Sequence, residues 1–213
     1  MDTANLSALR YRTALGDKHS RNHIFVGLAA QGSRILELGC ADGFISEHLV
    51  ERGCTVTGVE ADVQAAEYAK KWCERVIVCD LNRPGWLSTV GRDFDTVLCG
   101  DVLEHLANPW STLREISQVL TPKGRVIISL PNIANLRMRL NLLMGRFDYQ
   151  TGGILDITHL RFFTLKTARA LVEESGYRIV SFYPVVGGKL TRPLRLLFPK
   201  LFAVQMIFVA VPA

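Results

Sequence analysis

The chain of 213 residues contains no long hydrophobic run, no low-complexity segment and no internal repeat. Because a membrane-spanning helix needs about 20 consecutive apolar residues, the sequence argues against a membrane span. The N-terminus, with Asp2 and Arg10, lacks the apolar core of a secretory signal. The five cysteines are an odd number without paired or metal-type spacing, so we expect reduced thiols in a cytoplasmic protein. These absences favour one large α/β domain over residues 1–213.

The charged residues are unevenly distributed along the chain, although the net charge is only +5. Residues 1–120 carry 12 Lys and Arg against 16 Asp and Glu, whereas residues 121–213 carry 13 against 4. A basic half of this kind favours an anionic substrate or a negatively charged surface. Nucleic acid is disfavoured, because the basic residues are interleaved with Leu and Phe rather than gathered in a solvated stripe.

Residues 34–60 predict a strand, a glycine turn, a helix and a second strand. The apolar run Ile35–Leu38 is typical of a buried strand, and apolar residues at helical spacing begin at Phe44. The second run, Thr55–Val59, is followed by Glu60. This layout is half of a nucleotide-binding α/β fold, in which glycines let the backbone approach the ligand and the acid accepts hydrogen bonds from ribose hydroxyls.

The glycine spacing separates two classes of cofactor. A dinucleotide fingerprint that starts at Gly39 requires glycine two and five residues later, where the chain has Ala41 and Phe44. Instead, the pattern Glu37-x-Gly39-x-x-x-Gly43 resembles the first motif of class I S-adenosylmethionine-dependent methyltransferases. That family usually has a further glycine at the position of Ala41, so alanine is a mild departure. The alternative is a nucleotide-free turn that uses glycine only for its geometry.

The resemblance implies S-adenosyl-L-methionine as the cofactor and S-adenosyl-L-homocysteine as the product. In this family an acid at the end of the third strand, here Asp80, contacts the adenine amino group with help from the next residue, Leu81. The loop after the fourth predicted strand lines the methionine end of the cofactor. The residues expected to bind the cofactor are Glu37, Gly39, Cys40, Ala41, Gly43, Phe44, Glu60, Ala61, Asp80, Leu81, Gly100, Asp101 and Val102.

The order of the predicted elements indicates the fold class. Strands and helices alternate from residue 34 to residue 130, which predicts parallel strands with right-handed crossovers and helices on both faces. The last two predicted strands, Tyr177–Val185 and Ala203–Val211, are an antiparallel pair in the resembled family. We therefore expect a Rossmann-like, seven-stranded, mostly parallel α/β sheet with its ligand at the carboxyl ends of the strands.

The stretch after the fourth predicted strand, Asp101-Val-Leu-Glu-His-Leu106, resembles the corresponding motif of small-molecule methyltransferases, including the quinone-biosynthesis type. The resemblance implies a loop that opens onto the substrate, so we expect Glu104 to bind substrate and His105 to be a catalytic candidate. A related Glu-His pair begins a metal site in small-RNA 3′-end methyltransferases, where two further histidines complete it. Those partners are missing from the residues that follow here, and no metal is predicted. The alternative role of His105 is to hold the loop.

Residues 131–164 are the least regular part of the chain and form the predicted substrate-binding insertion. The string Thr-His-x-Arg-Phe-Phe within it is similar to strings in glycan-associated methyltransferases. His159 is the first candidate and His105 the second for the base that takes the proton of an acceptor hydroxyl, because a neutral imidazole suits that task near pH 7. Arg161 is expected to bind a substrate phosphate or carboxylate, with Asp156 and Asn132 as further substrate contacts. Alternatively, Asp156, His159 and Arg161 form a clasp that fixes the loop.

Two further segments complete the predicted organisation. Residues 1–30 are expected to form an N-terminal helical cap that packs on the sheet and over the cofactor mouth. Residues 187–202 form a basic, apolar segment with Pro193 and Pro199, which argue against one long helix. Such a segment can lie on anionic lipid. Packing on its own domain or on a second subunit is the favoured interpretation.

The sequence thus predicts an S-adenosylmethionine-dependent methyltransferase. The acceptor is expected to be a hydroxyl, or less favourably an amine, of a small and anionic biosynthetic intermediate such as a sugar or a nucleotide-linked sugar. A protein that binds the cofactor without turnover is the first alternative, and a nucleic-acid methyltransferase is the second. Peripheral membrane contact is disfavoured, and a homo-oligomer is left open.

Overall fold

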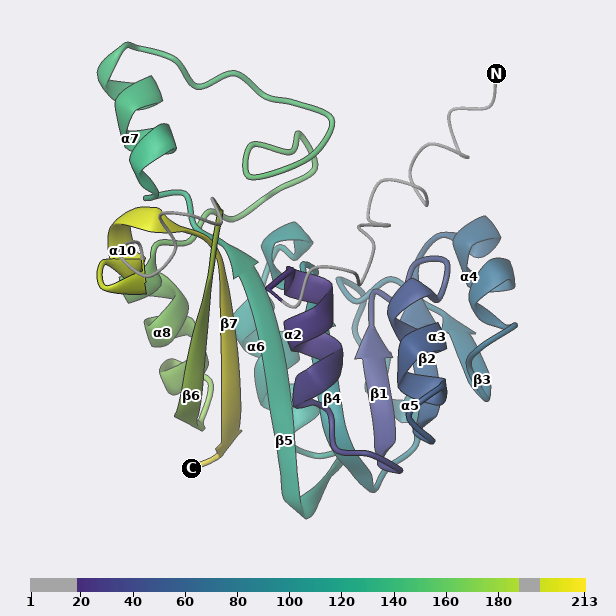
Figure 1. Ribbon diagram of the computed structural model, residues 1–213. Coiled ribbons are helices and arrows are strands. Elements are labelled where there is room, and N and C mark those ends of the chain that lie inside the picture. The colour runs from purple at the N-terminus through teal and green to yellow at the C-terminus, as the bar shows by residue number, and fades with distance from the viewer. Residues whose placement is uncertain (1–18, 188–195) are drawn as a thin grey trace.

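A computed structural model describes residues 19–187 and 196–213 of the chain. A seven-stranded sheet with the strand order β3-β2-β1-β4-β5-β7-β6 forms its centre (Figure 1). The strands are β1 (Arg34–Leu38), β2 (Thr55–Glu60), β3 (Arg75–Val78), β4 (Phe94–Gly100), β5 (Leu120–Pro131), β6 (Tyr177–Val186) and β7 (Ala203–Pro212).

The pairing of the strands confirms the predicted fold class. The first five strands along the chain pair in parallel, with β1 between β2 and β4. The last two are antiparallel to each other, and β7 joins the sheet antiparallel to β5. The chain adds β2 and β3 on one side of β1 and then β4 and β5 on the other. This change in strand order opens a crevice at the carboxyl ends of β1 and β4, where ligands of such sheets bind.

Helices cover both faces of the sheet (Figure 1). One hydrophobic cluster joins β1 and β2 to α2, α3 and α4, and a second joins the other face to α5, α6 and α8. The helices are α2 (Arg21–Leu28), α3 (Phe44–Val50), α4 (Val63–Ala69), α5 (Leu87–Val90), η1 (Leu103–His105), α6 (Pro109–Ile116), α7 (Leu136–Leu143), α8 (Leu165–Glu174) and α10 (Pro199–Phe202). Within the described ranges, none is long and apolar enough to cross a membrane.

The start of β5 is irregular. Helix α6 ends at Ile116, and the strand begins at Leu120. Leu120 pairs with Phe94, and the register then shifts before Arg125 pairs with Thr96. The chain therefore accommodates the Pro-Lys-Gly stretch as an irregularity within the strand pair, instead of ending a helix with it.

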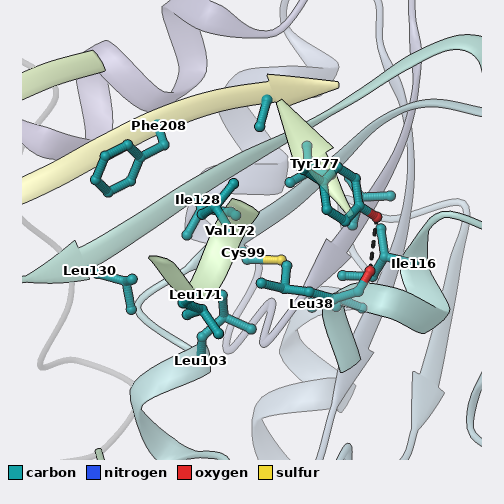
Figure 2. Packing of buried hydrophobic residues seen from close by; sticks show 14 of the residues in the cluster. Leu38, Cys99, Leu103, Ile116, Ile128, Leu130, Leu171, Val172, Tyr177 and Phe208 are labelled. Atoms are coloured by element: carbon teal, nitrogen blue, oxygen red, sulfur yellow. Dashed lines mark hydrogen bonds between the residues drawn. The ribbon is translucent and has the colours of Figure 1, made fainter. Parts of the chain in front are cut away.

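The core between the sheet and α8 fixes the C-terminal strand pair. Tyr177 is buried at the start of β6, and its hydroxyl donates a 2.8 Å hydrogen bond to the backbone carbonyl of Leu113 in α6 (Figure 2). Ile128 and Leu171 are fully buried in the same cluster. Cys99 lies there as a buried free thiol, which agrees with its predicted role as a small hydrophobic residue.

The irregular segment lies beyond the carboxyl end of the sheet. The arrowheads of β1 and β5 point towards the top of Figure 1, where α7 and the loop after it are drawn. α7 begins at a side-chain cap, because Asn135 Oδ1 accepts a hydrogen bond from Met138 N at 3.1 Å. Residues 188–195, and with them Pro193 of the predicted basic segment, lie outside the described residues, as does the part of the predicted N-terminal cap before residue 19.

Candidate cofactor and acceptor site

A cavity of about 370 Å³ opens at the carboxyl ends of β1, β2, β3 and β4. Its walls come from the glycine turn after β1, the ends of β2 and β3, the loop after β4, and α2. Of the thirteen residues predicted to bind the cofactor, all except Gly43 line it: Glu37, Gly39, Cys40, Ala41, Phe44, Glu60, Ala61, Asp80, Leu81, Gly100, Asp101 and Val102. Four segments that are far apart in sequence therefore contribute to one pocket.

The turn after β1 depends on residues in the left-handed region of φ. Gly39, Ala41 and Gly43 have φ values of +69°, +48° and +81°. A Cβ atom on Gly43 would lie 2.9 Å from the Cα of Ala69 in α4, and one on Gly39 would lie 3.1 Å from Val102 Cγ2. Gly43 therefore does not line the pocket, but its lack of a side chain lets the start of α3 pack closely against α4. The positive φ of Ala41 explains why the resembled family usually has glycine at this position.

Glu60 is fixed by three backbone amides. Ala41 N donates to Oε2 at 2.9 Å, and Ala61 N and Asp62 N donate to Oε1 at 2.8 and 2.9 Å. The carboxylate therefore ties the glycine turn to the end of β2. Two carboxylate oxygens offer about four lone-pair directions, so acceptor capacity remains for ligand hydroxyl groups. This geometry fits the expected ribose contact.

Asp80 lies just beyond the carboxyl end of β3, which ends at Val78. Asn82 N donates to Asp80 Oδ1 at 2.9 Å, while Arg83 Nε lies 3.8 Å from Oδ2. The Asn82 side chain in turn accepts from Ala107 N at 2.8 Å, which connects this loop to the loop after η1. The Asp80 side chain is 44% exposed and lines the cavity, so it is open to a hydrogen-bond donor on a ligand.

Asp101 joins three elements that the sequence did not connect. Its backbone has φ +55°, and its carboxylate accepts from Ser129 Oγ of β5 at 2.8 Å. Arg21 of α2 forms an ion pair with Asp101 Oδ2, and the Gln205 side chain of β7 donates to Oδ1. The sequence does not predict the contacts of Arg21 and Gln205 with Asp101, because nothing in the local pattern shows which distant side chain reaches a strand end. Arg21 also lines the cavity.

Glu37 is a buried acid on the floor of the cavity. It is 5% exposed, and Ser46 Oγ donates to its Oε2 at 2.5 Å. Burial raises the pKa of Glu37 to about 8, and the Ser46 hydrogen bond opposes that rise in part. A cationic ligand group beside Glu37 would favour its ionised form. S-adenosylmethionine carries two such groups, a sulfonium and an ammonium, so the residues present fit this cofactor.

His105 and His159 lie in contact, but only His105 lines the cavity. Their ring centroids are 4.7 Å apart, and His159 is 8% exposed. His159 Nδ1 lies 3.0 Å from the Ile154 carbonyl oxygen. Burial, together with the neighbouring His105, lowers the pKa of His159 and favours its neutral form. From the sequence, His159 is the first candidate for the base and His105 the second. In the structure His105 lines the cavity, and His159 contacts His105 without lining the cavity itself.

The remaining predicted substrate residues are engaged mainly with backbone. Asn132 is fully buried, and its amide nitrogen donates to the Ala203 carbonyl at 2.9 Å. Asp156 is also buried and accepts from Thr158 N and Oγ1 at 2.9 and 2.6 Å. Arg161 is exposed, and its Nε and Nη2 donate to the Ala107 carbonyl at 3.2 and 2.6 Å. These three residues hold the loop around the cavity, and none of them lines it.

Glu104 is completely buried beside the two histidines. Its Oε1 lies 4.0 Å from His159 Nε2, and burial together with the Asp101 carboxylate raises its pKa well above the usual range. Its backbone carbonyl accepts from Leu160 N and Arg161 N at 2.9 and 3.0 Å. Glu104 therefore anchors the acceptor-side loop against η1 through backbone, while its carboxyl group faces His159.

Comparison with known proteins agrees with this geometry. The family model for the methyltransferase domain matches residues 9–182. The ubiquinone biosynthesis O-methyltransferase of Aeromonas salmonicida is 32% identical over 118 residues, which cover 54% of this chain and 49% of that protein. The mitochondrial ubiquinone biosynthesis O-methyltransferase of Schizosaccharomyces pombe is 34% identical over 104 residues, 46% of this chain and 38% of that protein. The chain thus spans half or less of the length of these relatives.

A solved S-adenosylmethionine-dependent methyltransferase from Archaeoglobus fulgidus has the same fold, with a TM-score of 0.72 at 18% identity over 98% of this chain and 99% of that one. The parallel sheet, the glycine turn and the acids at the ends of β2 and β3 define the class I S-adenosylmethionine-dependent fold. Since the family model covers most of its length, the chain belongs to the methyltransferase domain family. S-adenosylmethionine is the cofactor that the pocket accommodates.

Proposed function

We propose that this chain transfers a methyl group from S-adenosylmethionine to a hydroxyl group of a small biosynthetic intermediate. The observation that carries the proposal is the position of His105, which lines the same cavity as Glu60 and Asp80 and adjoins the irregular segment 145–163 through Thr158. A cofactor pocket with an imidazole at the edge where the acceptor segment begins has the parts that O-methylation requires.

Each part of the pocket has a role in positioning. Glu60 would accept the ribose hydroxyls, Asp80 the adenine amino group, and Glu37 would lie near the cationic end of the ligand. When bound, S-adenosylmethionine supplies a methyl group on a sulfonium, a good leaving group for in-line displacement. The chain then needs chiefly to align the acceptor oxygen with that methyl carbon and to exclude water. Asp80 and His105 both line the cavity. Asp80 would lie at the adenine end of the bound cofactor, and His105 would lie at the end where the methyl group meets the acceptor.

The proton of the acceptor hydroxyl must leave as the oxygen attacks. The oxygen–carbon bond forms, the carbon–sulfur bond breaks, and the sulfonium becomes a neutral thioether, so one proton is released. His105 is the side chain placed to act on that proton, and His159 and Glu104 lie directly behind it. We therefore assign proton removal to this cluster, with His105 as the member that meets the acceptor.

The acceptor segment favours a partly apolar molecule. Phe147, Tyr149 and Phe162 form a chain of edge-to-face rings with centroid separations of 5.6 to 5.7 Å, and Phe162 continues to His159 at 6.2 Å. The names of the curated relatives point to an intermediate of quinone biosynthesis, rather than to the sugar or nucleotide-linked sugar expected from the sequence. We propose a ring-bearing hydroxyl compound as the acceptor class.

The test is product formation from a defined acceptor panel. The purified chain would be incubated with S-adenosylmethionine and with phenolic, sugar and nucleotide-sugar acceptors, and S-adenosylhomocysteine would be measured by mass spectrometry. We expect product with phenolic acceptors and at least a hundredfold loss in His105→Asn, whereas His48→Asn, which changes a half-buried histidine outside the cavity, keeps the rate. Cofactor binding without product from any acceptor would instead favour the non-catalytic binding protein, and product only with nucleic acid would favour the second alternative.

A further inference from the structure

Three side chains with metal-binding atoms come together beside the cavity. Glu104 and His105 belong to η1, while His159 comes from the loop after α7, and one ligand atom of each lies within 4.8 Å of the others. The sequence analysis predicted no metal because the residues directly after His105 lack further histidines. The fold brings His159 to the pair from a distant part of the chain, so that reason no longer applies.

The carboxyl group of Glu104 is buried and lacks hydrogen-bond partners among the described residues. Its side chain is fully buried, and within residues 19–187 and 196–213 neither carboxylate oxygen has a hydrogen-bond partner. A polar group that is buried without a hydrogen-bond partner destabilises the fold. The two neighbouring rings offer one contact, His159 Nε2 at 4.0 Å, which is longer than a hydrogen bond. A cation between these groups would satisfy the carboxylate.

Both imidazoles are held in the orientation that metal ligands adopt. His105 Nδ1 lies 3.2 Å from both the carbonyl oxygen and the Oγ1 of Thr158, and the Thr158 hydroxyl donates its own hydrogen to Asp156 Oδ1 at 2.6 Å. His159 Nδ1 lies 3.0 Å from the Ile154 carbonyl oxygen. A carbonyl only accepts, so each Nδ1 carries the hydrogen and each Nε2 carries a lone pair. A backbone carbonyl that orients the second ring nitrogen is the usual support of a metal-bound histidine. The tautomers are therefore set for coordination through Nε2.

We propose that Glu104, His105 and His159 bind one divalent transition-metal ion. Two imidazoles and one carboxylate suit ions such as Zn²⁺, Mn²⁺ or Co²⁺, whereas Mg²⁺ and Ca²⁺ prefer sites made of oxygen ligands. Metal–ligand bonds of about 2.1 Å place neighbouring ligand atoms roughly 3–3.5 Å apart. Small side-chain rotations would close the present cluster onto an ion. Three protein ligands leave at least one coordination position for another molecule.

The open position has a chemical use if the proposed O-methylation is correct, and this part of the inference rests on that function. His105 is the ligand that also lines the cavity, so the ion would lie between the buried Glu104 and the acceptor space. An acceptor hydroxyl bound to the ion would lose its proton more readily, because the metal stabilises the resulting oxyanion. The ion would then replace the His105 ring as the group that prepares the oxygen, and the proton would pass to solvent.

Metal binding can be measured without any acceptor. The chain, prepared without a histidine tag and stripped with a chelator, would be titrated with Co²⁺ alone by calorimetry and by visible absorption. We expect one equivalent bound, the absorption of a nitrogen-ligated site, and a rise in Tm of roughly 5–10 °C when the ion exceeds its Kd a hundredfold. The same titration with Mg²⁺ should give at least a hundredfold weaker binding.

Variants separate this site from adventitious binding. Glu104→Gln keeps the shape of the side chain and removes its charge, so it should fold at least as well as the parent in chelator while losing the Co²⁺-induced rise in Tm. His159→Gln should weaken binding at least a hundredfold. His48→Gln is the matched control, because His48 forms a 2.9 Å pair with Glu51 on the surface, and it should leave Co²⁺ binding unchanged.

Two results would overturn the proposal. One is the lack of stoichiometric Co²⁺ binding by the stripped chain, and the other is equal binding by Glu104→Gln and the parent. S-adenosylhomocysteine release in chelator distinguishes this failure from failure of the proposed function. Full turnover by metal-free protein would remove the ion but leave O-methylation intact, whereas stoichiometric Co²⁺ binding without product from any acceptor would leave the site and remove the function.

Discussion

The two sides of the site are built by different means. On the cofactor side, residues 39–62 hold their shape through backbone amides and positive φ values, as the three amides on Glu60 illustrate. On the acceptor side, side chains from η1 and from the loop before α8 meet across a large sequence separation, and each bonds the other segment's backbone. A backbone-built site tolerates many side-chain changes but few changes of glycine. A site built from side chains should tolerate changes of nearby glycines but few changes of the side chains themselves.

Gly43→Ala should have the largest effect. The added Cβ would be 2.9 Å from the Cα of Ala69, and the residue would remain at φ +81°. Left-handed strain and overpacking together should lower the free energy of unfolding by about 3 kcal/mol, or Tm by roughly 6–12 °C. The control is Gly145→Ala on the acceptor side, where φ is +71° but no atom lies within 4 Å of the added Cβ. Thermal unfolding should show a loss of only about 1 kcal/mol there, and equal losses would refute the packing role of Gly43.

Glu60→Gln should weaken cofactor binding and also lower the folding temperature, because the amide NH₂ would face a backbone N–H that now donates to the carboxylate. The amide can replace only part of the acceptor capacity that three backbone amides and the ligand hydroxyls use. Because hydrogen bonds to charged groups contribute about 1.5–3 kcal/mol each, the Kd for S-adenosylmethionine should rise roughly 10- to 100-fold. Glu67→Gln, which removes a surface ion pair with Lys70, should leave the Kd unchanged in the same calorimetric titration. An unchanged Kd in Glu60→Gln would show that the ribose contact is elsewhere.

The pH dependence of stability should expose Glu37. Its folded-state pKa of about 8 lies above the ordinary value of 4.5, so between these two values the folded protein holds the proton more tightly than the unfolded chain. The contribution of Glu37 to stability must therefore fall as the pH rises from 4.5 to about 8 and level off above that. Glu37→Gln cannot titrate there. The stability of the parent relative to this variant should decline from pH 5 to pH 9 in denaturant unfolding, and a constant difference would contradict the assignment.

Ala41→Gly should have the smallest effect and the opposite sign. Ala41 has φ +48°, and its backbone N–H to Glu60 would be kept in the variant. Relief of left-handed strain outweighs the extra flexibility of glycine, so the free energy of unfolding should rise by about 0.5 kcal/mol. Denaturant unfolding of the two proteins at one pH measures this difference. A loss of stability would show that the turn is not strained at this residue.

The contrast between the two sides also explains what the sequence could predict. The spacing of Gly39 and Gly43, the acid at Glu60 and the order of strands and helices along the chain follow from local patterns, and each appears in the structure as expected. Arg21 reaches Asp101 only because α2 packs on the face of the sheet over β5 and β7, and no periodicity in the sequence specifies that contact. The order of His105 and His159 relative to the cavity likewise depends on the path of an irregular loop. Asn132, expected at the substrate, is buried under β7 for the same reason.

Calorimetric titration of S-adenosylmethionine into the parent chain and into His105→Asn tests the central claim most directly. If the cofactor side is a separate, backbone-built unit, both proteins should bind one equivalent with Kd values within about threefold, and only the parent should release S-adenosylhomocysteine with a phenolic acceptor. No heat from the parent at millimolar cofactor, or loss of cofactor binding in His105→Asn, would contradict the account.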